Sequence, residues 1–575
     1  MKNGNTSVKK ILSILLCLGF ILALGFFYYQ YYQKDNINLS SFVPEDTLLY
    51  VKQKDLGKLT DDFNKNSLAE AIQSIDYIKL ALDLDVSYYT VEKLRSVLEF
   101  ADSEIFSLIF NELFSKNFSF ALLSGTKKDG IETYFNSNIL LLCTPKHRSN
   151  LLEVTLPLLD NDLTVISNHY GKYVIKRIEI SEKLKISIAK IGPKYLIALD
   201  RRTLRKALDR YDEKKTNLSE NFFFHELEEK YKTANLFTFL SLKKMYMQAE
   251  LYLKDKPGDN ENLRNQLRNW RGFTAAGYGS WRKNDVSRNL LSLYFNNLEI
   301  PTNTSNILGI QPEENSVISF VPNDTLFYYW TNTFDLPTLW SIYENESSMP
   351  PAAIKDLKES MQDVTDLSFD DLVSLPGNSF HIIARRPSPV DLLPVPNFSL
   401  IVDLENIRKT KWVLNNFFFK NDIPHGRDIY KGVYFTYWGD GMQRGLQPVY
   451  AFYENLLILS SSVKMHISII DAILKKNGLI TKEKFLKIGK PLLLKNNSMA
   501  IIELSELLQV LKELIRWSGT IMAIQNQETA KKSKILIDDL ILPLLDGLKM
   551  YPNIVTRSYN SEGLLSIESN TIISH

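Results

Sequence analysis

The feature that most constrains this chain is an internal duplication. Residues 41–50 read SFVPEDTLLY and residues 319–328 read SFVPNDTLFY, so eight of the ten positions are identical. Shorter matches follow both segments in the same order, and the last one pairs residues 290–293 with residues 564–567. The spacing between matching residues drifts along the chain, as insertions and deletions in surface loops would make it drift. The chain is therefore predicted to contain two homologous repeats.

The matches place repeat one at residues 40–300 and repeat two at residues 317–575. Residues 301–316 are rich in Pro, Asn and Thr, which is typical of a linker. Each repeat opens with a Pro-x-Asp-Thr turn that suits the entry to a strand. Hairpin patterns outnumber strand–helix–strand units in both repeats. The prediction is an α+β fold in which each repeat has an antiparallel sheet and packed helices.

The N-terminal residues predict a membrane segment. Residues 1–10 carry three lysines and no acid, and residues 11–29 form an almost unbroken apolar run. At about 1.5 Å per residue this run spans roughly 28 Å, close to the hydrocarbon thickness of a bilayer. The positive flank predicts a cytoplasmic N-terminus at 1–10, a transmembrane helix at 11–29 that acts as a signal-anchor, and an exported body. The expected location is a bacterial inner membrane, single-pass, with the bulk of the chain in the periplasm.

Other interpretations of the N-terminus stay open. The small residues Ala23 and Gly25 would suit a signal peptidase, but the mature chain would then begin with four aromatic residues. A lipid anchor on Cys17 is disfavoured by the preceding Leu16, because a small residue is expected there. The other cysteine, Cys143, ends a buried-looking strand and is interpreted as a core residue. No disulfide framework is expected.

Composition excludes several classes of protein. Lys plus Arg is 68 and Asp plus Glu is 66, so the formal net charge is only +2. Hydrophobic residues make up 45% of the 575 residues and charged residues 23%, which excludes a disordered chain and a multi-span transporter. The small net charge argues against a dedicated nucleic-acid binder, which needs a basic excess. No nucleic-acid partner is expected.

No motif in the sequence indicates a catalytic, cofactor-binding or metal-binding residue. Gly439, Gly441 and Gly445 have the wrong spacing for a dinucleotide site. Residues 277–281 do not match a serine-nucleophile elbow. The seven histidines show no metal-ligand spacing. The chain is expected not to be an enzyme and to have no cofactor.

The strongest local charge cluster lies on a predicted helix. Its basic residues are Arg201, Arg202, Arg205, Lys206 and Arg210, and Leu204, Leu208 and Tyr211 mark an opposing apolar stripe. A solvated helix face is the simpler interpretation. The alternative is contact with an anionic surface, such as lipid headgroups or a polyanionic envelope polymer. The matching segment of repeat two has no arginine, so this role would belong to one copy only.

Aromatic residues offer one more candidate. Residues 328–330 and 417–419 are runs of three aromatics. Core packing is the simpler interpretation, and an apolar groove for a lipid chain or a partner segment is the alternative.

The two Phe-Val-Pro-x-Asp-Thr-Leu openings, at residues 42–48 and 320–326, carry a resemblance. They resemble a family of uncharacterised bacterial envelope proteins that have one N-terminal membrane segment and exported domains with a similar opening strand. The resemblance implies an envelope location and supplies no catalytic residue.

We therefore expect a membrane-anchored exported envelope protein that acts as a non-enzymatic binding or scaffold module. Its partners would be the membrane, through the N-terminal helix, and an envelope protein or a lipid. Two alternatives stay open. One is a carrier of lipid or another hydrophobic ligand, and the other is an enzyme whose site converges from distant residues.

Overall fold

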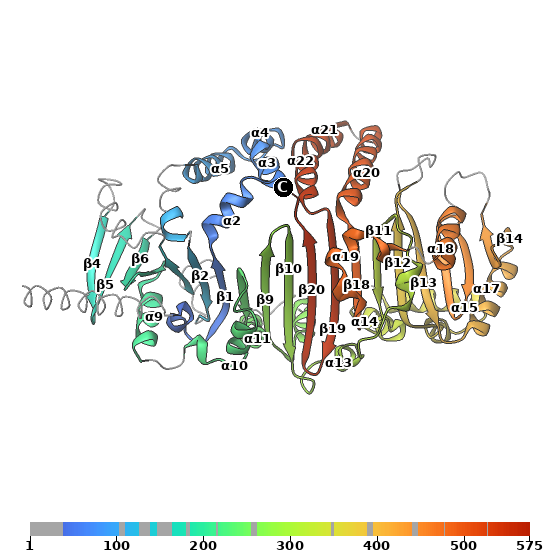
Figure 1. Cartoon of the computed structure of the whole chain (residues 1–575), viewed down its shortest axis with the longest axis horizontal. Coiled ribbons are helices and arrows are strands. Elements are labelled where there is room, and N and C mark those ends of the chain that lie inside the picture. The colour runs from blue at the N-terminus through green and yellow to red at the C-terminus, as the bar shows by residue number, and fades with distance from the viewer. Residues whose placement is uncertain are drawn as a thin grey trace, which may run out of the picture. The chain divides into compact units, whose positions relative to one another are not determined.

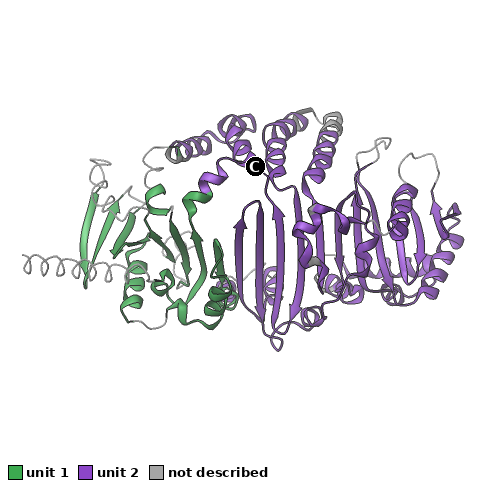
Figure 2. Cartoon of the chain, viewed as in Figure 1, with its two compact units in different colours: residues 1–59, 100–248 green, residues 60–99, 249–575 purple. Residues whose placement is uncertain are grey.

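The computed structural model describes most of the chain outside the N-terminal segment. The described residues are 38–102, 110–114, 116–125, 138–145, 164–179, 185–213, 217–254, 261–346, 350–387, 395–439, 447–475, 478–525 and 527–574. The chain forms two compact units, which are coloured separately in Figure 2. Unit 1 comprises residues 1–59 and 100–248, and unit 2 comprises residues 60–99 and 249–575.

Unit 1 is built on an antiparallel sheet with the strand order β8–β1–β2–β3–β7–β6–β5–β4 (Figure 1). The bounds are β1 (Thr47–Lys54), β2 (Asn117–Leu123), β3 (Ile139–Thr144), β4 (Thr164–Tyr170), β5 (Tyr173–Glu179), β6 (Lys185–Ile191), β7 (Lys194–Ala198) and β8 (Leu236–Leu240).

Unit 2 is built on a longer antiparallel sheet with the order β9–β10–β20–β19–β18–β11–β12–β13–β17–β16–β15–β14. The bounds are β9 (Phe273–Lys283), β10 (Val286–Phe295), β11 (Thr325–Thr331), β12 (Pro376–Arg385), β13 (Asn397–Leu404), β14 (His425–Tyr430), β15 (Val433–Trp438), β16 (Val449–Tyr453), β17 (Leu456–Ser460), β18 (Ser498–Glu503), β19 (Asn553–Ser561) and β20 (Leu564–Ile572).

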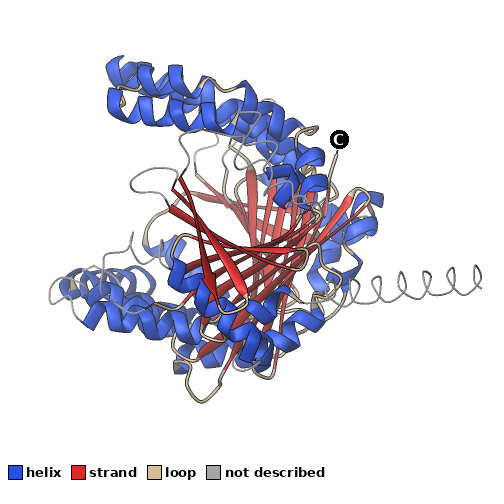
Figure 3. Cartoon of the chain, turned by 90° about the vertical axis from the view of Figure 1, so that its left-hand side faces the viewer, coloured by secondary structure: helices blue, strands red, loops and turns tan. Residues whose placement is uncertain are grey.

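Some helices pack against these strands, and others, at the top of Figure 3, pack mainly on other helices. Their bounds are α2 (Leu56–Phe63), α3 (Ser67–Ser74), α4 (Tyr77–Asp83), α5 (Tyr88–Ala101), α9 (Arg201–Glu213), α10 (Phe222–Lys230), α11 (Leu242–Lys254), α12 (Glu261–Arg268), α13 (Thr302–Gly309), α14 (Leu336–Glu346), α15 (Pro351–Thr365), α16 (Phe369–Val373), α17 (Ile407–Lys420), α18 (Val463–Lys475), α19 (Glu483–Ile488), α20 (Leu504–Gln525), α21 (Gln527–Leu536) and α22 (Leu542–Gly547). Short helical turns are η1 (Leu39–Phe42), η2 (Leu218–Glu220), η3 (Ser316–Phe320), η4 (Leu479–Thr481), η5 (Lys490–Leu493), η6 (Ile537–Ile541) and η7 (Leu548–Met550).

Eight strands of unit 2, from β18 to β14, follow the same order as the eight strands of unit 1. The registers agree as well. Tyr50 of β1 aligns through β2 and β3 with Ala198 of β7. Tyr328 of β11 aligns through β12 and β13 with Ser460 of β17. This agreement assigns each strand residue of unit 1 a counterpart in unit 2.

Strands from both sequence halves share the sheet of unit 2, which corrects the predicted fold class. We expected two repeats that each had a separate sheet. Instead β10, from the first half, pairs antiparallel with β20, from the second half, and Ser292 lies opposite Ser566. Both serines are buried, at 0% and 1% exposure. The described residues thus form a fold of twenty antiparallel strands with helices. The cause is that each half ends in a hairpin whose outer strand is free to pair with its counterpart.

The expectation of a transmembrane helix is also corrected. Within the residues that the structure describes, no helix has the length and apolar character needed to span a bilayer. Even α20, which has 22 residues, carries Glu506, Lys512 and Arg516. The predicted segment 11–29 lies outside the described residues. The prediction of a single-pass inner-membrane protein does not agree with this finding and is not retained.

Residues 301–316, which we predicted to be a linker, begin with α13 and then contact the sheet. The Glu313 amide donates to the Asn496 carbonyl at 2.9 Å. The amide side chains of Asn332 and Asn497 donate to the carbonyls of Gln311 and Ile310, each at 2.9 Å. Paired asparagine side chains therefore hold this segment against the sheet of unit 2.

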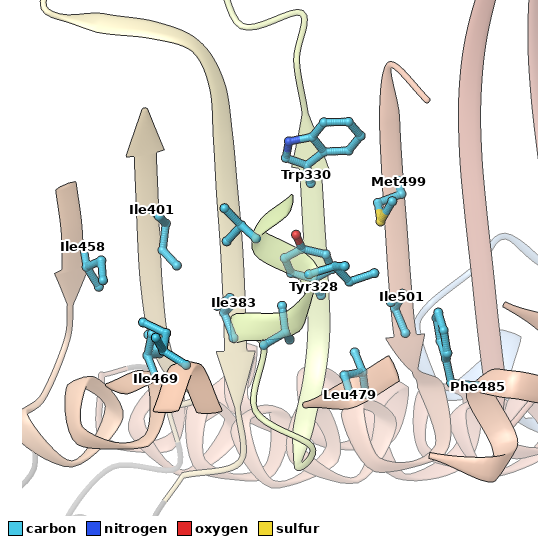
Figure 4. Packing of buried hydrophobic residues seen from close by; sticks show 14 of the residues in the cluster. Tyr328, Trp330, Ile383, Ile401, Ile458, Ile469, Leu479, Phe485, Met499 and Ile501 are labelled. Carbon is cyan, nitrogen blue, oxygen red and sulfur yellow. The ribbon is translucent and has the colours of Figure 1, made fainter. Parts of the chain in front are cut away.

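The main core of unit 2 packs η3, α18 and α19 against β11, β12, β13, β17 and β18 (Figure 4). Tyr328 lies at its centre and is fully buried, so its hydroxyl requires partners. Asn315 donates its side-chain amide to the Tyr328 hydroxyl at 2.8 Å, and His381 Nδ1 lies 3.0 Å from it. The counterpart in unit 1, Tyr50, pairs with the Ser119 hydroxyl at 3.0 Å. Both sheets therefore anchor their opening strand through a buried tyrosine.

A buried ion pair lies where β10, β20 and β19 meet. The Glu568 carboxylate is only 4% exposed and accepts two hydrogen bonds from Arg557, at 2.7 and 2.9 Å. Arg288 on β10 lies 3.0 Å from its other oxygen. The carboxylate therefore joins side chains from both sequence halves.

We predict that Glu568→Gln lowers the free energy of unfolding of unit 2 by about 3 kcal/mol, because it leaves the partly buried charge of Arg557 without its carboxylate partner. Urea unfolding read through hydrogen exchange of the β19 and β20 amides measures this loss. The control is Glu359→Gln, since the Lys355–Glu359 pair is exposed on both sides. It should change stability by no more than about 0.5 kcal/mol. Equal effects of the two substitutions would contradict the prediction.

Candidate functional site

A cavity of about 140 Å³ lies in unit 1, between the end of β1 and the end of α10. Its charged and polar lining consists of Asn38, Lys52, Lys54, Glu228, Glu229 and Lys232. The ring of Tyr231 lines the cavity too, together with Ala234 and Phe237. Three ammonium groups therefore face two carboxylates, and the lining has a net positive charge.

The local sequence explains why these groups meet. Side chains alternate along β1, so Lys52 and Lys54 share the face of the buried Tyr50. The Tyr50 ring packs edge-on against Phe224 of α10, with 5.4 Å between the centroids. Glu228 follows Phe224 by one helical turn and therefore lies on the same side of α10. The packing of the two rings thus brings Glu228 over Lys52.

Both glutamates of the lining already have partners. Glu228 lies 3.2 Å from the Lys52 ammonium, and its two oxygens accept hydrogen bonds from Asn38 at 3.0 and 3.1 Å. Glu229 lies 3.3 Å from the ammonium of Lys232. These contacts reduce the negative charge that the cavity presents to a ligand.

Lys54 differs from the other two lysines. Its ammonium donates to the Lys232 carbonyl at 2.6 Å, and no carboxylate within the described ranges forms an ion pair with it. Burial lowers the pKa of Lys54, and the nearby charge of Lys52 lowers it further. Lys54 therefore contributes a positive charge whose only hydrogen bond in the described ranges goes to a carbonyl, although the neighbouring charge of Asp55 partly compensates it.

A fourth lysine, Lys194, lies on the same sheet face. It begins β7, one residue before the Cys143–Tyr195 pair of β3 and β7, and β2 and β3 lie between it and β1. Its exposed fraction is 4%, and in the part of the chain that the structure describes its ammonium has no hydrogen bond or ion pair and keeps some contact with solvent. Burial, and then the charge of Lys52, lower the pKa of Lys194 to about 8. Lys194 does not line the cavity, but the charge of Lys52 is near enough to lower its pKa.

The second copy of the fold, the strands β18 to β14 of unit 2, has other residue types at the positions of these lysines. The counterparts of Lys52 and Lys194 are Trp330 and Leu456, which are 2% and 7% exposed and belong to the main core of unit 2. Figure 4 shows Trp330 in this core. The counterpart of Lys54 is Asn332, whose amide binds the 301–316 segment. The fold can therefore be completed at these positions without any lysine.

The five basic residues predicted from sequence all lie on α9, and none of them lines the cavity. Leu204 and Leu208 of the same helix are buried, as the predicted apolar stripe requires. Lys206 pairs with Asp46 at 2.8 Å. The Arg205 guanidinium lies 4.8 Å from the centre of the Tyr170 ring. The predicted contact of this helix with an anionic surface stays a prediction.

The aromatic runs are mostly core residues. Tyr328 and Trp330 are buried in unit 2, and Phe418 is 4% exposed. Phe419, in contrast, is 85% exposed. Cys143 is fully buried, which raises the pKa of its thiol to about 12. Among the described residues, no group of three or more His, Cys, Asp or Glu side chains is arranged to hold a metal ion.

Sequence reasoning missed the lysines of the cavity. One signal was present, because residues 50–54 read YVKQK where the matching residues 328–332 read YYWTN. A pair of lysines in one copy replaces a tryptophan and an asparagine in the other. Lys194 and Glu228 carry no comparable signal, since only strand pairing and helix packing bring them near Lys52.

Comparisons with known proteins add little. No protein-family description and no curated protein matches the chain. Crystal forms III and I of TP0453 match 49% of this chain and 91% and 90% of theirs. The sequence identity is 10% in both cases, with TM-scores of 0.25 and 0.26. A similarity this low carries no argument about this protein.

We predict that Lys194→Leu, which installs the residue of the second copy, raises the free energy of unfolding of unit 1 by up to about 3 kcal/mol near neutral pH. The folded-state pKa of Lys194 is lowered from 10.5 to about 8. The unfolded chain therefore binds more protons between these values, and the stability of the unchanged protein rises with pH across this window.

Urea unfolding at about pH 7 and about pH 10 checks both parts of this prediction, because the advantage of the variant should shrink at the higher pH. Lys243→Leu is the matched control, since Lys243 is exposed on α11. A variant that is less stable than the unchanged protein at both pH values would show the prediction to be wrong.

Proposed function

We propose that this protein is a non-enzymatic binding module of the bacterial cell envelope, and that the cavity of unit 1 binds an anionic group of its ligand. The observation that carries the proposal is the charge distribution of this cavity. Its two carboxylates are paired, whereas the Lys54 ammonium has only a carbonyl partner among the described residues. A partly buried ammonium of this kind gains from an anionic partner, because hydrogen bonds to charged groups are stronger than neutral ones.

The size of the cavity supports a small group rather than a large ligand. A volume of about 140 Å³ is close to the roughly 150 Å³ of an engineered cavity that holds benzene. A carboxylate, phosphate or sulfate group has room there. The rings of Tyr231 and Phe237 offer apolar contacts to the atoms that carry this group.

The envelope location rests on the resemblance of the two Pro-x-Asp-Thr openings to exported envelope proteins. Fractionation of cells that express the full chain tests this part of the proposal. The protein should be recovered with the envelope fractions. Recovery in the cytoplasmic fraction alone would refute an envelope role.

We predict that the full chain binds sulfate and that Lys54→Gln weakens this binding about tenfold or more, because it removes a charge-assisted hydrogen bond. Isothermal titration at constant ionic strength measures the change, since salt screens exposed charges. Lys243→Gln is the matched control and should bind sulfate like the unchanged protein. Equal sulfate affinity of the Lys54→Gln variant and the control would refute the proposed role of the cavity.

A further inference from the structure

We propose that Asn38 is a positioning residue of the cavity. Its side-chain amide holds the Glu228 carboxylate on Lys52, and the charge of Lys54 thereby stays available to an anionic ligand. This inference rests on the proposed binding function of the cavity and adds how the protein sets the affinity of that site. Three features support it: the hydrogen bonds of the carboxylate, the arrangement of the two lysines on β1, and the contrast with the second copy of the fold.

Three contacts fix the Glu228 carboxylate. The amide nitrogen of Asn38 lies 3.0 Å from one of its oxygens and 3.1 Å from the other. The Lys52 ammonium lies 3.2 Å from the first of these oxygens. The glutamate side chain is only 16% exposed, and hydrogen bonds to an ionised group are stronger than neutral ones. The two bonds from Asn38 therefore decide where this carboxylate lies.

The two lysines of β1 compete for this carboxylate. Lys52 and Lys54 lie on the same face of the strand, about 7 Å apart along it, and both line the cavity with Glu228. A carboxylate that is free to move gains more Coulomb energy between two ammonium groups than beside one. In the structure the Lys54 ammonium donates instead to the Lys232 carbonyl at 2.6 Å. By holding the carboxylate on the first lysine, the Asn38 amide keeps it from compensating the second.

The two ends of the Asn38 side chain have different roles. Its oxygen accepts a hydrogen bond from the Ser40 amide at 3.5 Å and caps η1, whereas its nitrogen donates to Glu228. The corresponding turn η3 is capped by Asn315, whose nitrogen donates to the buried Tyr328 hydroxyl at 2.8 Å. A cap requires only the side-chain oxygen, which serine or aspartate also supplies. The amide nitrogen therefore has a role of its own in each copy.

The second copy lacks this carboxylate. Leu218 of η2 and Leu479 of η4 are equivalent, because each donates its backbone amide to the valine carbonyl of its own Phe-Val-Pro opening, at 2.7 and 2.9 Å. Counting from these two residues aligns Glu228 with Gly489, which has no side chain. The positions of both β1 lysines are uncharged in that copy too. The glutamate thus occurs only in the copy that has the lysines, and there a capping asparagine binds it.

The test measures the sulfate affinity of the full chain by isothermal titration at constant ionic strength. Asn38→Ala should bind sulfate about fivefold more weakly, because the released carboxylate then compensates Lys54. Asn38→Ser keeps a good capping residue but loses the amide nitrogen, so it should bind sulfate as weakly as Asn38→Ala. Full affinity in Asn38→Ser would mean that residue 38 acts only as a helix cap, which would overturn the inference.

A double substitution shows whether Asn38 acts through Glu228. Glu228→Gln removes the carboxylate charge and should bind sulfate at least as tightly as the unchanged protein, because a negative charge near the ligand is lost. Adding Asn38→Ala to Glu228→Gln should then change the affinity by no more than about twofold, since no carboxylate is left to release. An equal loss of affinity from Asn38→Ala with and without Glu228→Gln would refute the positioning role.

These outcomes are distinct from those that test the proposed function. If Lys54→Gln lowers the sulfate affinity while Asn38→Ala leaves it unchanged, the cavity is still supported as the site and the role of Asn38 is refuted. If Lys54→Gln has no effect, the proposed function and this inference are both wrong. Circular dichroism confirms that each variant is folded before its affinity is compared.

Discussion

The pairing of β10 with β20 is the interaction on which the architecture of unit 2 depends. Each of these strands is the outer strand of a hairpin and would otherwise expose a row of unpaired backbone groups. Their pairing removes both edges and joins the two sequence halves in one hydrogen-bonded sheet. Glu568, Arg557 and Arg288 add a charged contact across the same three strands.

The sequence predicted the opening strands, the hairpins at the ends of the two halves and the antiparallel character of the sheets, because these follow from short-range patterns. Residues 290–293 and 564–567 are recognisable as equivalents, yet nothing in their pattern indicates that they pair with each other. Strand partners depend on long-range contacts, which periodicity does not encode. This is why the prediction that each half keeps its strands in a sheet of its own was wrong.

The cavity was harder to predict than the fold. Lysines that alternate with other residues along a strand usually form a solvated face, and Lys52 and Lys54 have this appearance in the sequence. Their significance depends on Glu228, which the Tyr50–Phe224 contact positions, and on the Lys232 carbonyl, to which Lys54 donates. These partners therefore become visible only in three dimensions. The α9 cluster was visible in the sequence because its charges are adjacent along one helix.

The serines that face each other in the β10–β20 pair are also equivalent positions of the duplication. An antiparallel pair centred on equivalent residues is the arrangement found where two identical subunits meet at a twofold axis. In a true homodimer, every substitution appears twice, so a lysine at the position of Lys194 would lower the stability of both subunits. Covalent fusion of the copies removes this coupling. One half can then keep a tryptophan and a leucine for stability while the other half varies.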